Sequence, residues 1–185
     1  MSNQQPLPEN AKRVFKGVIF DVYQWEQEMF DGSFDTFERL KRPDTAQVIP
    51  VVGDKILVQV QKQPNMIKSC FSLPGGRCEE GEDPMVAAKW EMLEETGYSS
   101  DDMILWKEMN PVGKMVWTIY TYIAYDCQKA QEPQLDAGEQ IENKLISFEE
   151  FLMLSEDPTF YEKELVPVLL RARFDKITRD KLYKL

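Results

Sequence analysis

The hydrophobic residues of this chain fall mainly into short runs that are separated by turn residues. Runs rich in Val, Ile, Phe and Tyr between Gly, Pro, Asn and Asp are typical of β-strands. The segments of this kind are Val14–Trp25, Phe34–Lys41, Ala46–Val52, Lys55–Val60, Cys70–Leu73, Met103–Met109, Val116–Tyr125 and Ile141–Ile146. Turn signals at Asp31-Gly32 and Gly53-Asp54 predict that the first four of these strands form two consecutive hairpins.

A central helix is expected over Pro84–Thr96. Asp83 is suited to cap its N-terminus, and Pro84 fits the first turn because no backbone donor is needed there. Gly97 follows as the glycine that commonly ends a helix.

Two more helices are expected near the C-terminus. Ser147 and Glu150 have the spacing of a capping box, so a helix should follow Ser147. Pro158 opens a second helix that should run to about Phe174. Many strands with three helices indicate a mixed α/β sandwich, and residues 1–12, which are polar and contain two prolines, predict a flexible tail.

The charge balance restricts the possible partners. The 185 residues include 22 Lys and Arg against 32 Asp and Glu, which gives a net charge of −10. Nucleic-acid binding normally requires a basic stripe, so we expect no nucleic-acid partner. Acidic residues can still bind phosphates when a divalent cation lies between them. No apolar run approaches the roughly 18 residues that cross a bilayer, and the first residues lack a secretion signal, so no membrane association is expected.

Histidine and cysteine usage limits the chemistry. The chain has no histidine, which excludes Ser-His-Asp and Cys-His catalysis and histidine-ligated zinc or haem. Its three cysteines, Cys70, Cys78 and Cys127, are expected to be reduced thiols of a cytoplasmic protein. A Cys70–Cys78 bridge across a turn is the alternative.

Three glutamates gather on one face of the central helix. On a helical wheel Glu94 and Glu95 lie on either side of Glu91, and the three span about 100°. Their mutual repulsion would become binding energy if a cation lay between them, and oxygen-only ligands favour Mg²⁺, Mn²⁺ or Ca²⁺ over zinc. A solvated acidic helix face is the alternative, but the preceding Gly75 and Gly76 favour the close approach of backbone to a ligand.

The same stretch resembles the signature of the Nudix hydrolases, G-x5-E-x7-R-E-U-x-E-E-x-G-U, in which U is a bulky apolar residue. The matching positions are Gly76, Glu82, Glu91, Met92, Glu94, Glu95, Gly97 and Tyr98. The resemblance implies a Nudix-type α/β/α sandwich with a mixed sheet over residues 45–185. It also implies an N-terminal β-hairpin extension over residues 13–44.

Trp90 stands where the family signature has arginine, which is understood to hold the neighbouring glutamates in position. Tryptophan cannot form the charge-assisted fork that arginine makes to carboxylates. We expect Trp90 to pack against a neighbouring strand, while Lys89, another basic group or the metal holds Glu91. A catalytically weakened nucleotide-binding or regulatory protein is therefore the alternative to an active enzyme.

The wider layout resembles the ADP-ribose pyrophosphatase branch of the family. LPGG at residues 73–76 is similar to LPAG in that branch, where the residue at Gly75 offers its backbone carbonyl to a metal. Pro111 lies near the proline that marks the branch. Gln63 and Ser72 replace an arginine and a glutamate that are common there, and these departures concern the substrate more than the reaction class.

What this resemblance implies is hydrolysis of a pyrophosphate bond in a nucleoside diphosphate linked to another moiety, of the ADP-ribose or nucleotide-sugar type. The cofactor would be Mg²⁺, with Mn²⁺ possible, and the implied metal ligands are Gly75, Glu91, Glu94 and Glu95. Glu139, or secondarily Glu142, would take the proton of the attacking water beside the catalytic Glu91, and Glu82 would support the loop.

The implied substrate-binding residues are Arg39, Glu38 and Gln61, with the first two on a hairpin that reaches a partner subunit in a homodimer. The aromatic residues Trp117, Tyr120 and Tyr122 are expected to pack in the core, with stacking on a base as the alternative. An acidic protein-interaction domain is a third hypothesis, which rests only on the net charge.

Overall fold

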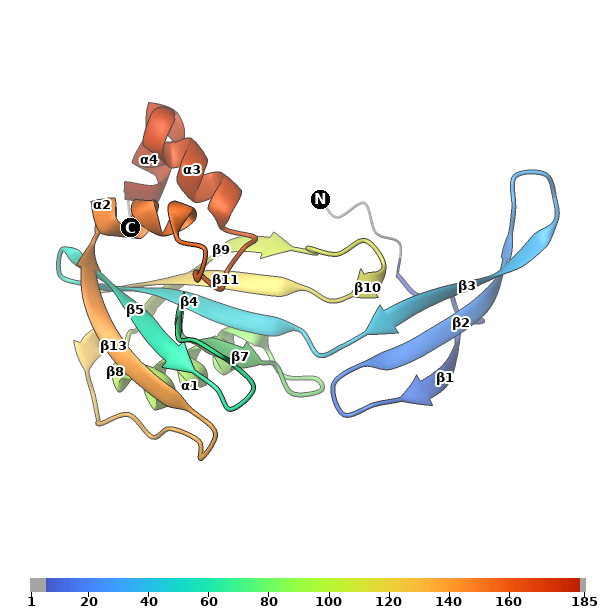
Figure 1. Cartoon of the computed structure of the whole chain (residues 1–185), viewed down its shortest axis with the longest axis horizontal. Coiled ribbons are helices and arrows are strands. Elements are labelled where there is room, and N and C mark those ends of the chain that lie inside the picture. Colours follow the sequence, from blue (N-terminus) through green and yellow to red (C-terminus); the bar gives the residue numbers. More distant parts are fainter. Residues whose placement is uncertain (1–5, 184–185) are drawn as a thin grey trace.

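A computed structural model describes residues 6–183, which divide into a narrow N-terminal arm and a broader body (Figure 1). The arm is a four-stranded sheet in the order β1-β2-β3-β10. Its strands are β1 (Lys12–Lys16), β2 (Asp21–Glu28), β3 (Phe34–Lys41) and β10 (Met115–Val116). Residues 1–5 of the predicted tail lie outside the described residues, and residues 6–11 precede the first strand.

The single strand predicted over Val14–Trp25 is wrong, because β1 and β2 are two antiparallel strands joined by a tight turn. Gly17 donates its N–H to the carbonyl of Phe20 over 3.0 Å, and a methyl group on Gly17 would overlap that carbonyl oxygen. The residues between them are β-branched or aromatic, so the hydrophobic pattern continues through the turn and conceals it.

The body is built on a seven-stranded mixed sheet in the order β13-β5-β4-β11-β9, with β6 paired to β5 and β7 paired to β4. Its strands are β4 (Thr45–Val52), β5 (Lys55–Lys62), β6 (Cys70–Ser72), β7 (Gly75–Arg77), β9 (Asp102–Met109), β11 (Ile119–Tyr125) and β13 (Gln140–Ser147). The pair β4–β11 is parallel. Beside this sheet, β8 (Tyr98–Ser99) pairs with β12 (Gln128–Lys129).

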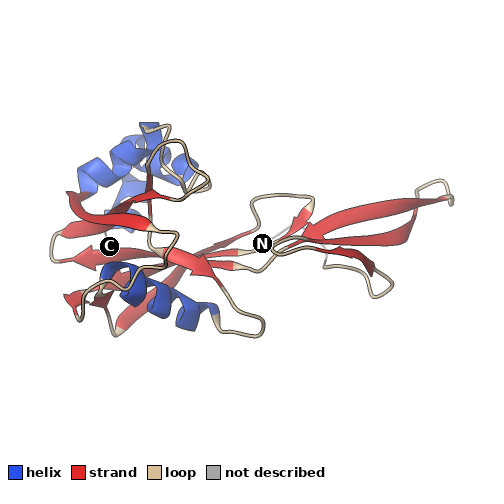
Figure 2. Cartoon of the chain, turned by 60° about the horizontal axis from the view of Figure 1, so that its bottom comes forward, coloured by secondary structure: helices blue, strands red, loops and turns tan. Residues whose placement is uncertain are grey.

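Helices cover both faces of the body's sheet, as Figure 2 shows. On one face lies α1 (Pro84–Thr96), and on the other lie α2 (Phe148–Met153), the 3-10 helix η1 (Leu154–Glu156), α3 (Val166–Phe174) and α4 (Lys176–Tyr183). Successive residues of β4 point to opposite faces, so Val48 packs in the cluster under α1 and Ile49 in the cluster under α2 and α3. The predicted α/β/α sandwich with a mixed sheet is confirmed.

The ends of α1 and α2 follow the sequence signals. The Asp83 side chain accepts the N–H of Met85, and Gly97 ends α1 at φ 73°, in the left-handed region. Ser147 and Glu150 form the expected capping box.

The helix predicted from Pro158 to Phe174 begins late, at Val166. Proline lacks a backbone N–H and its ring clashes with the preceding turn, so Pro167 is tolerated only in the first turn of α3. Residues 157–165 therefore form an irregular segment that runs back toward the sheet.

Strands β4 and β5 separate along their length, and this opens the place of the candidate site. They pair with each other only at Val51 and Val52 of β4. Beyond that point β5 pairs with β6 and the start of β4 pairs with β7. The connection between β6 and β7, at Leu73 and Pro74, therefore enters between the two separated strands.

Candidate active site

Glu95 of α1 anchors the acidic end of the site. Its Oε2 atom accepts the backbone N–H of Gly75 at 3.0 Å and the side-chain amide of Gln59 at 3.1 Å. Gln59 in turn accepts a hydrogen bond from the Ser72 hydroxyl at 3.4 Å. Because these three side chains are buried, neutral donors rather than a basic side chain fix the Glu95 carboxylate.

Gly75 and Gly76 let the backbone of β7 approach its neighbours closely. A methyl group on Gly75 would lie 2.7 Å from the Cα of Gln47 on β4. A methyl group on Gly76 would overlap the Glu91 carboxylate. The two glycines thus leave space for the backbone of β4 and for the side chain of α1.

Burial and mutual repulsion raise the pKa values of the helix carboxylates. Desolvation is the main cause for Glu91, whose pKa rises to about 7 with further contributions from Glu94 and Glu139. Desolvation also raises the pKa of Glu95 to about 8, against the opposing effect of its hydrogen bonds. Glu94 is exposed and borders the same cleft. Within residues 6–183, no ion pair includes any of these three glutamates.

These residues fit a divalent cation. Desolvated carboxylates without a basic partner favour the arrival of positive charge, and the donor set of Glu91, Glu94, Glu95 and the Gly75 carbonyl contains only oxygen, as hard cations prefer. Among the described residues, no three acidic or cysteine side chains already stand at metal-binding spacing. Glu95 points to Gly75 and Gln59, so the carboxylates would have to draw together around an ion.

A cleft of about 1080 Å³ extends from this acidic end toward the arm. The predicted residues that line it are Gly75, Glu91, Glu94, Glu95, Glu139 and Gln61. Met109 and Pro111 also line it.

Glu139 reaches the cleft from the loop before β13. The loop folds on itself, since Glu139 accepts the N–H of Asp136 at 3.2 Å and donates its own N–H to the Asp136 carbonyl. Glu82 accepts the N–H of Glu79 at 2.8 Å, so it supports the loop before α1 as expected.

Three predicted residues lie away from the cleft within one chain. Glu142 is exposed and pairs with Lys144 at 3.5 Å. Glu38 accepts a hydrogen bond from Gln24 on the arm, and the Arg39 guanidinium lies 5.7 Å from the ring centre of Trp25.

The predictions for the aromatic residues have different outcomes. Trp90 was expected to pack against a strand, but 57% of it is exposed and it belongs to neither core cluster of the described residues. Tyr122 and Tyr120 do pack in or against the core, whereas Trp117 lines the cleft. Lys89 is also exposed and forms no ion pair among the described residues.

Glu162, which lies in the irregular segment before α3, is not among the site residues predicted from the sequence. Its Oε1 accepts the N–H of Leu73 at 3.0 Å, and the residue is only 4% exposed. Its Oε2 is buried and has no hydrogen-bond partner among residues 6–183. Burial raises its pKa to about 8. Two residues on, Glu164 accepts the side-chain amide of Gln47 at 2.8 Å. This segment thus binds the connection before Gly75 through Leu73 and the facing strand β4 through Gln47. Pro167 was the signal that could have placed the segment outside a helix.

Comparison with known proteins identifies the same region. The profile described as NUDIX domain matches residues 41–167. ADP-ribose pyrophosphatase of Bacillus subtilis (strain 168) is 25% identical over 82% of this chain and 83% of its own length. The Methanol dehydrogenase activator of Bacillus methanolicus is 26% identical over 84% and 86%. ADP compounds hydrolase NudE of Escherichia coli (strain K12) is 21% identical over 93% and 94%.

The fold has a solved counterpart. A crystal structure of ADP compounds hydrolase superposes with a TM-score of 0.72 and 23% sequence identity, and covers 94% of this chain and 95% of that one. The similarity includes the arm as well as the body, since it extends over nearly the whole length of both chains.

Proposed function

Because the chain belongs to the NUDIX domain family, whose profile covers residues 41–167, we propose that it is a Mg²⁺-dependent pyrophosphatase. It would act on a nucleoside diphosphate linked to another moiety, of the ADP-ribose or nucleotide-sugar type. The names of the Bacillus subtilis and Escherichia coli relatives support a substrate that contains ADP.

The observation that carries the proposal is the pair of desolvated carboxylates, Glu91 and Glu95, beside the backbone of Gly75 and Gly76. Together with Glu94 they would hold the cation, and Mn²⁺ could replace Mg²⁺ there because both prefer oxygen ligands. When bound, the cation would neutralise the phosphate charge and make the attacking water more acidic.

The chain's own residues would supply the remaining roles. Glu139 lines the cleft and accepts the N–H of Asp136, and it would take the proton from the attacking water. Gln59 and the Gly75 N–H keep Glu95 in position by hydrogen bonds. Gln61 would donate to the substrate from the wall of the cleft.

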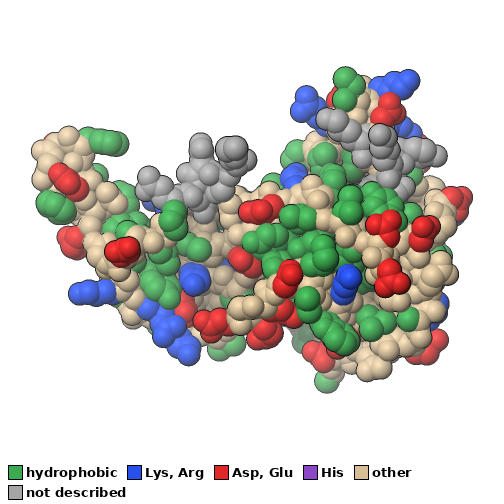
Figure 3. All heavy atoms as spheres, turned by 180° about the vertical axis from the view of Figure 1, so that it is seen from behind, with side chains coloured by type: hydrophobic (Ala, Val, Ile, Leu, Met, Phe, Trp, Pro, Cys, Tyr) green, Lys and Arg blue, Asp and Glu red, His purple; other side chains and the backbone are tan. Residues whose placement is uncertain are grey.

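A homodimer formed through the arm is part of the proposal. Apolar side chains of the arm are exposed, among them Phe15 at 59% and Val18 at 97%, and Figure 3 shows apolar side chains spread over the narrow arm. A partner subunit would cover these side chains, and Arg39 and Glu38 of each subunit would then reach the substrate in the cleft of the other.

The state of the cysteines supports a cytoplasmic location. The three cysteines are free thiols, which favours a reducing compartment. No helix among the described residues is long and apolar enough to cross a membrane.

The test is incubation with ADP-ribose, nucleotide sugars and dinucleotides in the presence of Mg²⁺. Hydrolysis is measured as the release of nucleoside monophosphate. Glu91→Gln and Glu139→Gln should each lower kcat by at least about 100-fold. Glu80→Gln, on an exposed loop residue of the same signature, serves as the matched control. No release from any member of the panel would overturn the proposal.

The alternative is a nucleotide-binding protein with weakened catalysis, and the exposed Trp90 in place of the signature arginine favours it. It predicts that nucleotides raise the melting temperature without being hydrolysed. Ligand at about 100 times its Kd should stabilise the fold by about 2.7 kcal/mol.

A further inference from the structure

The connection that enters between β4 and β5 is held by groups from other parts of the fold. Leu73 and Pro74 join β6 to β7 and precede Gly75, whose carbonyl belongs to the proposed cation site. Proline has no backbone N–H, so this connection has few donors. The Pro74 carbonyl accepts the N–H of Val48 at 2.9 Å, and Glu162 accepts the N–H of Leu73 at 3.0 Å.

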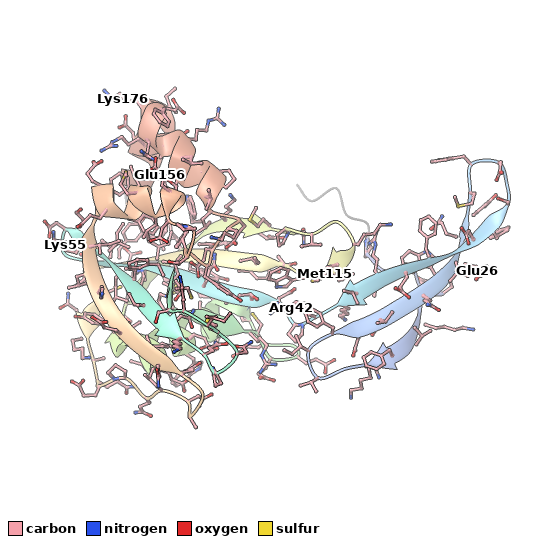
Figure 4. All side chains as sticks on the ribbon, in the orientation of Figure 1. Glu26, Arg42, Lys55, Met115, Glu156 and Lys176 are labelled. Atoms are coloured by element: carbon pink, nitrogen blue, oxygen red, sulfur yellow. The ribbon has the colours of Figure 1, made fainter. Side chains whose placement is uncertain are left out.

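Glu162 comes from the irregular segment between η1 and α3. In Figure 4, this segment begins after the labelled Glu156 and descends from the helices to the sheet before it returns into α3. The N–H of Tyr161 donates to the carbonyl of Phe71 on β6 at 2.7 Å. The segment is therefore bonded to β6 immediately before the residue that reaches the connection.

The Glu162 carboxyl is buried at a cost. Only 4% of the residue is exposed, and in the described part of the chain its Oε2 has no hydrogen-bond partner. A desolvated carboxyl with one unpaired oxygen costs free energy that a fully paired side chain would not. A buried polar atom in this state indicates a role beyond stability.

A second carboxylate of the same segment binds the strand that pairs with β7. Glu164 accepts the side-chain amide of Gln47 at 2.8 Å, and that amide also donates to the Thr121 hydroxyl at 3.0 Å. Gln47 is directly opposite Gly75 in the β4–β7 pair. The segment thus binds both the chain just before Gly75 and the strand opposite it.

Glu162 is placed to act through the backbone. Its Oε1 accepts the Leu73 N–H, and its Oε2 is buried. Two residues further along, the N–H of Gly75 donates to Glu95 at 3.0 Å. Two carboxyl groups, one from α1 and one from the irregular segment, therefore bind two N–H groups of this short stretch.

We propose that Glu162 is a positioning residue of the cation site, which fixes the place of the Gly75 carbonyl through the Leu73 N–H. Residues that hold metal ligands in place commonly change metal affinity by about 10- to 100-fold when they are replaced. Because the Gly75 carbonyl is a ligand only in the proposed cation site, the inference rests on that part of the proposed function and not on hydrolysis.

The test is titration of the whole protein with Mn²⁺ alone, measured by calorimetry. Glu162→Leu has a similar volume but no acceptor, so it should weaken Mn²⁺ binding by at least about tenfold. Glu162→Gln keeps an oxygen for the Leu73 N–H, so its affinity should stay within about threefold of wild type. Burial raises the pKa of Glu162 to about 8, which makes a neutral amide a suitable replacement.

Glu150→Leu is the matched control. Glu150 also accepts a backbone N–H, that of Ser147 at 2.8 Å, but it caps α2 and does not line the cleft. Its replacement should lower the melting temperature and leave Mn²⁺ affinity unchanged.

Hydrogen exchange supplies a measurement that needs no metal. The Gly75 N–H should exchange faster in Glu162→Leu than in wild type, and Glu162→Gln should restore its protection. If substrate is hydrolysed, Glu162→Leu should raise the Mg²⁺ concentration for half-maximal turnover by at least about tenfold.

A shorter carboxylate separates reach from charge. Glu162→Asp keeps the acid but is one carbon too short for the Leu73 N–H, so it should weaken Mn²⁺ binding where Glu162→Gln does not. It also takes the place of Glu162→Leu if that variant does not fold.

Four results would overturn the inference: no Mn²⁺ binding by wild type, unchanged binding in the variant that lacks the contact, an equal loss in Glu162→Gln, or an equal loss in Glu150→Leu. If substrate is hydrolysed and Glu162→Leu binds Mn²⁺ as wild type does, the inference fails and the proposed function stands. If no substrate is hydrolysed but Mn²⁺ affinity changes across the Glu162 variants as expected, the proposed hydrolysis fails and the positioning role stands.

Discussion

The arm and the body are both built on β-sheets, but only the body covers both faces of its sheet with helices. In the body, Ile49 and Val48 of one strand are completely buried on opposite faces. In the arm, Phe15 and Phe34 are 59% and 65% exposed. The apolar surface of the arm thus remains open to a partner, while that of the body is already used for folding.

The same contrast appears in the carboxylates. In the body, burial raises the pKa of Glu91, Glu95 and Glu162 to about 7 or 8. In the arm, hydrogen bonds from Ser33 lower the pKa of Asp31. The desolvated acids that a cation site needs therefore lie in the body, where helices cover the sheet, whereas hydrogen bonds and not burial determine the shift of Asp31 in the arm.

The strongest way to break this comparison is to remove one desolvated charge from the body. Glu95→Gln should reduce turnover by at least about 100-fold, because the amide cannot bind a cation as a carboxylate does. Steady-state kinetics over a range of Mg²⁺ concentrations measures this. Near-normal turnover would count against Glu95 as a metal ligand.

Gly76→Ala tests whether the space beside Glu91 matters. The new methyl group would overlap the Glu91 carboxylate, whose flexible end can move away. Turnover should then fall by about 10- to 100-fold while the melting temperature changes little. Gly113→Ala, where a methyl group meets nothing within 4 Å, is the control and should retain turnover.

The pH dependence of stability sharpens the electrostatic contrast. Glu91, Glu95 and Glu162 have folded pKa values of about 7 to about 8 against 4.5 as the ordinary value. Between those pH values the folded state holds more protons than the unfolded state, so the free energy of unfolding falls as pH rises. In EDTA, the melting temperature should decrease from about pH 5 to about pH 8, and Glu95→Gln should flatten that slope.

Divalent cations provide the control for this pH experiment. Mg²⁺ binds the ionised carboxylates, so it should recover most of the lost stability at the higher pH. A melting temperature that increases between the two pH values in EDTA would contradict the assignment of these three groups as desolvated acids.

Phe15→Asp tests the open face of the arm. It should convert a dimer into a monomer in light scattering and raise KM, while the fold of the body remains intact. Phe174→Asp, on an 83% exposed residue of the body, should leave the oligomeric state unchanged. A monomeric wild type would remove the basis of the proposed dimer.

Trp90→Arg should have the smallest effect. Glu95 is already fixed by Gln59 and Gly75, so restoring the signature arginine should change kcat by less than about threefold. A rise of more than about tenfold would instead favour the weakened-enzyme alternative.

Local signals predicted much of the fold, and tertiary contacts decided the rest. The strand β3 and the ends of α1 follow from turn and cap residues that act within a few positions. In the sequence, Gln59 is a single polar residue in a predicted strand, and nothing nearby indicates its partner. Its contact with Glu95 depends on the separation of β4 from β5 in the folded chain. Glu162 depends on the late start of α3.

The strand β10 has a mechanical consequence for the whole molecule. Leu40 and Arg42 donate their N–H groups to the carbonyls of Lys114 and Val116. Thr45 then donates to the carbonyl of Thr118, where the same two segments continue into β4 and β11. The arm is thus joined to the body by a hydrogen-bonded double ribbon instead of a single flexible connector. Such a ribbon resists torsion, so a force that a neighbouring molecule applies to the arm would be transmitted to Trp117 and Arg42.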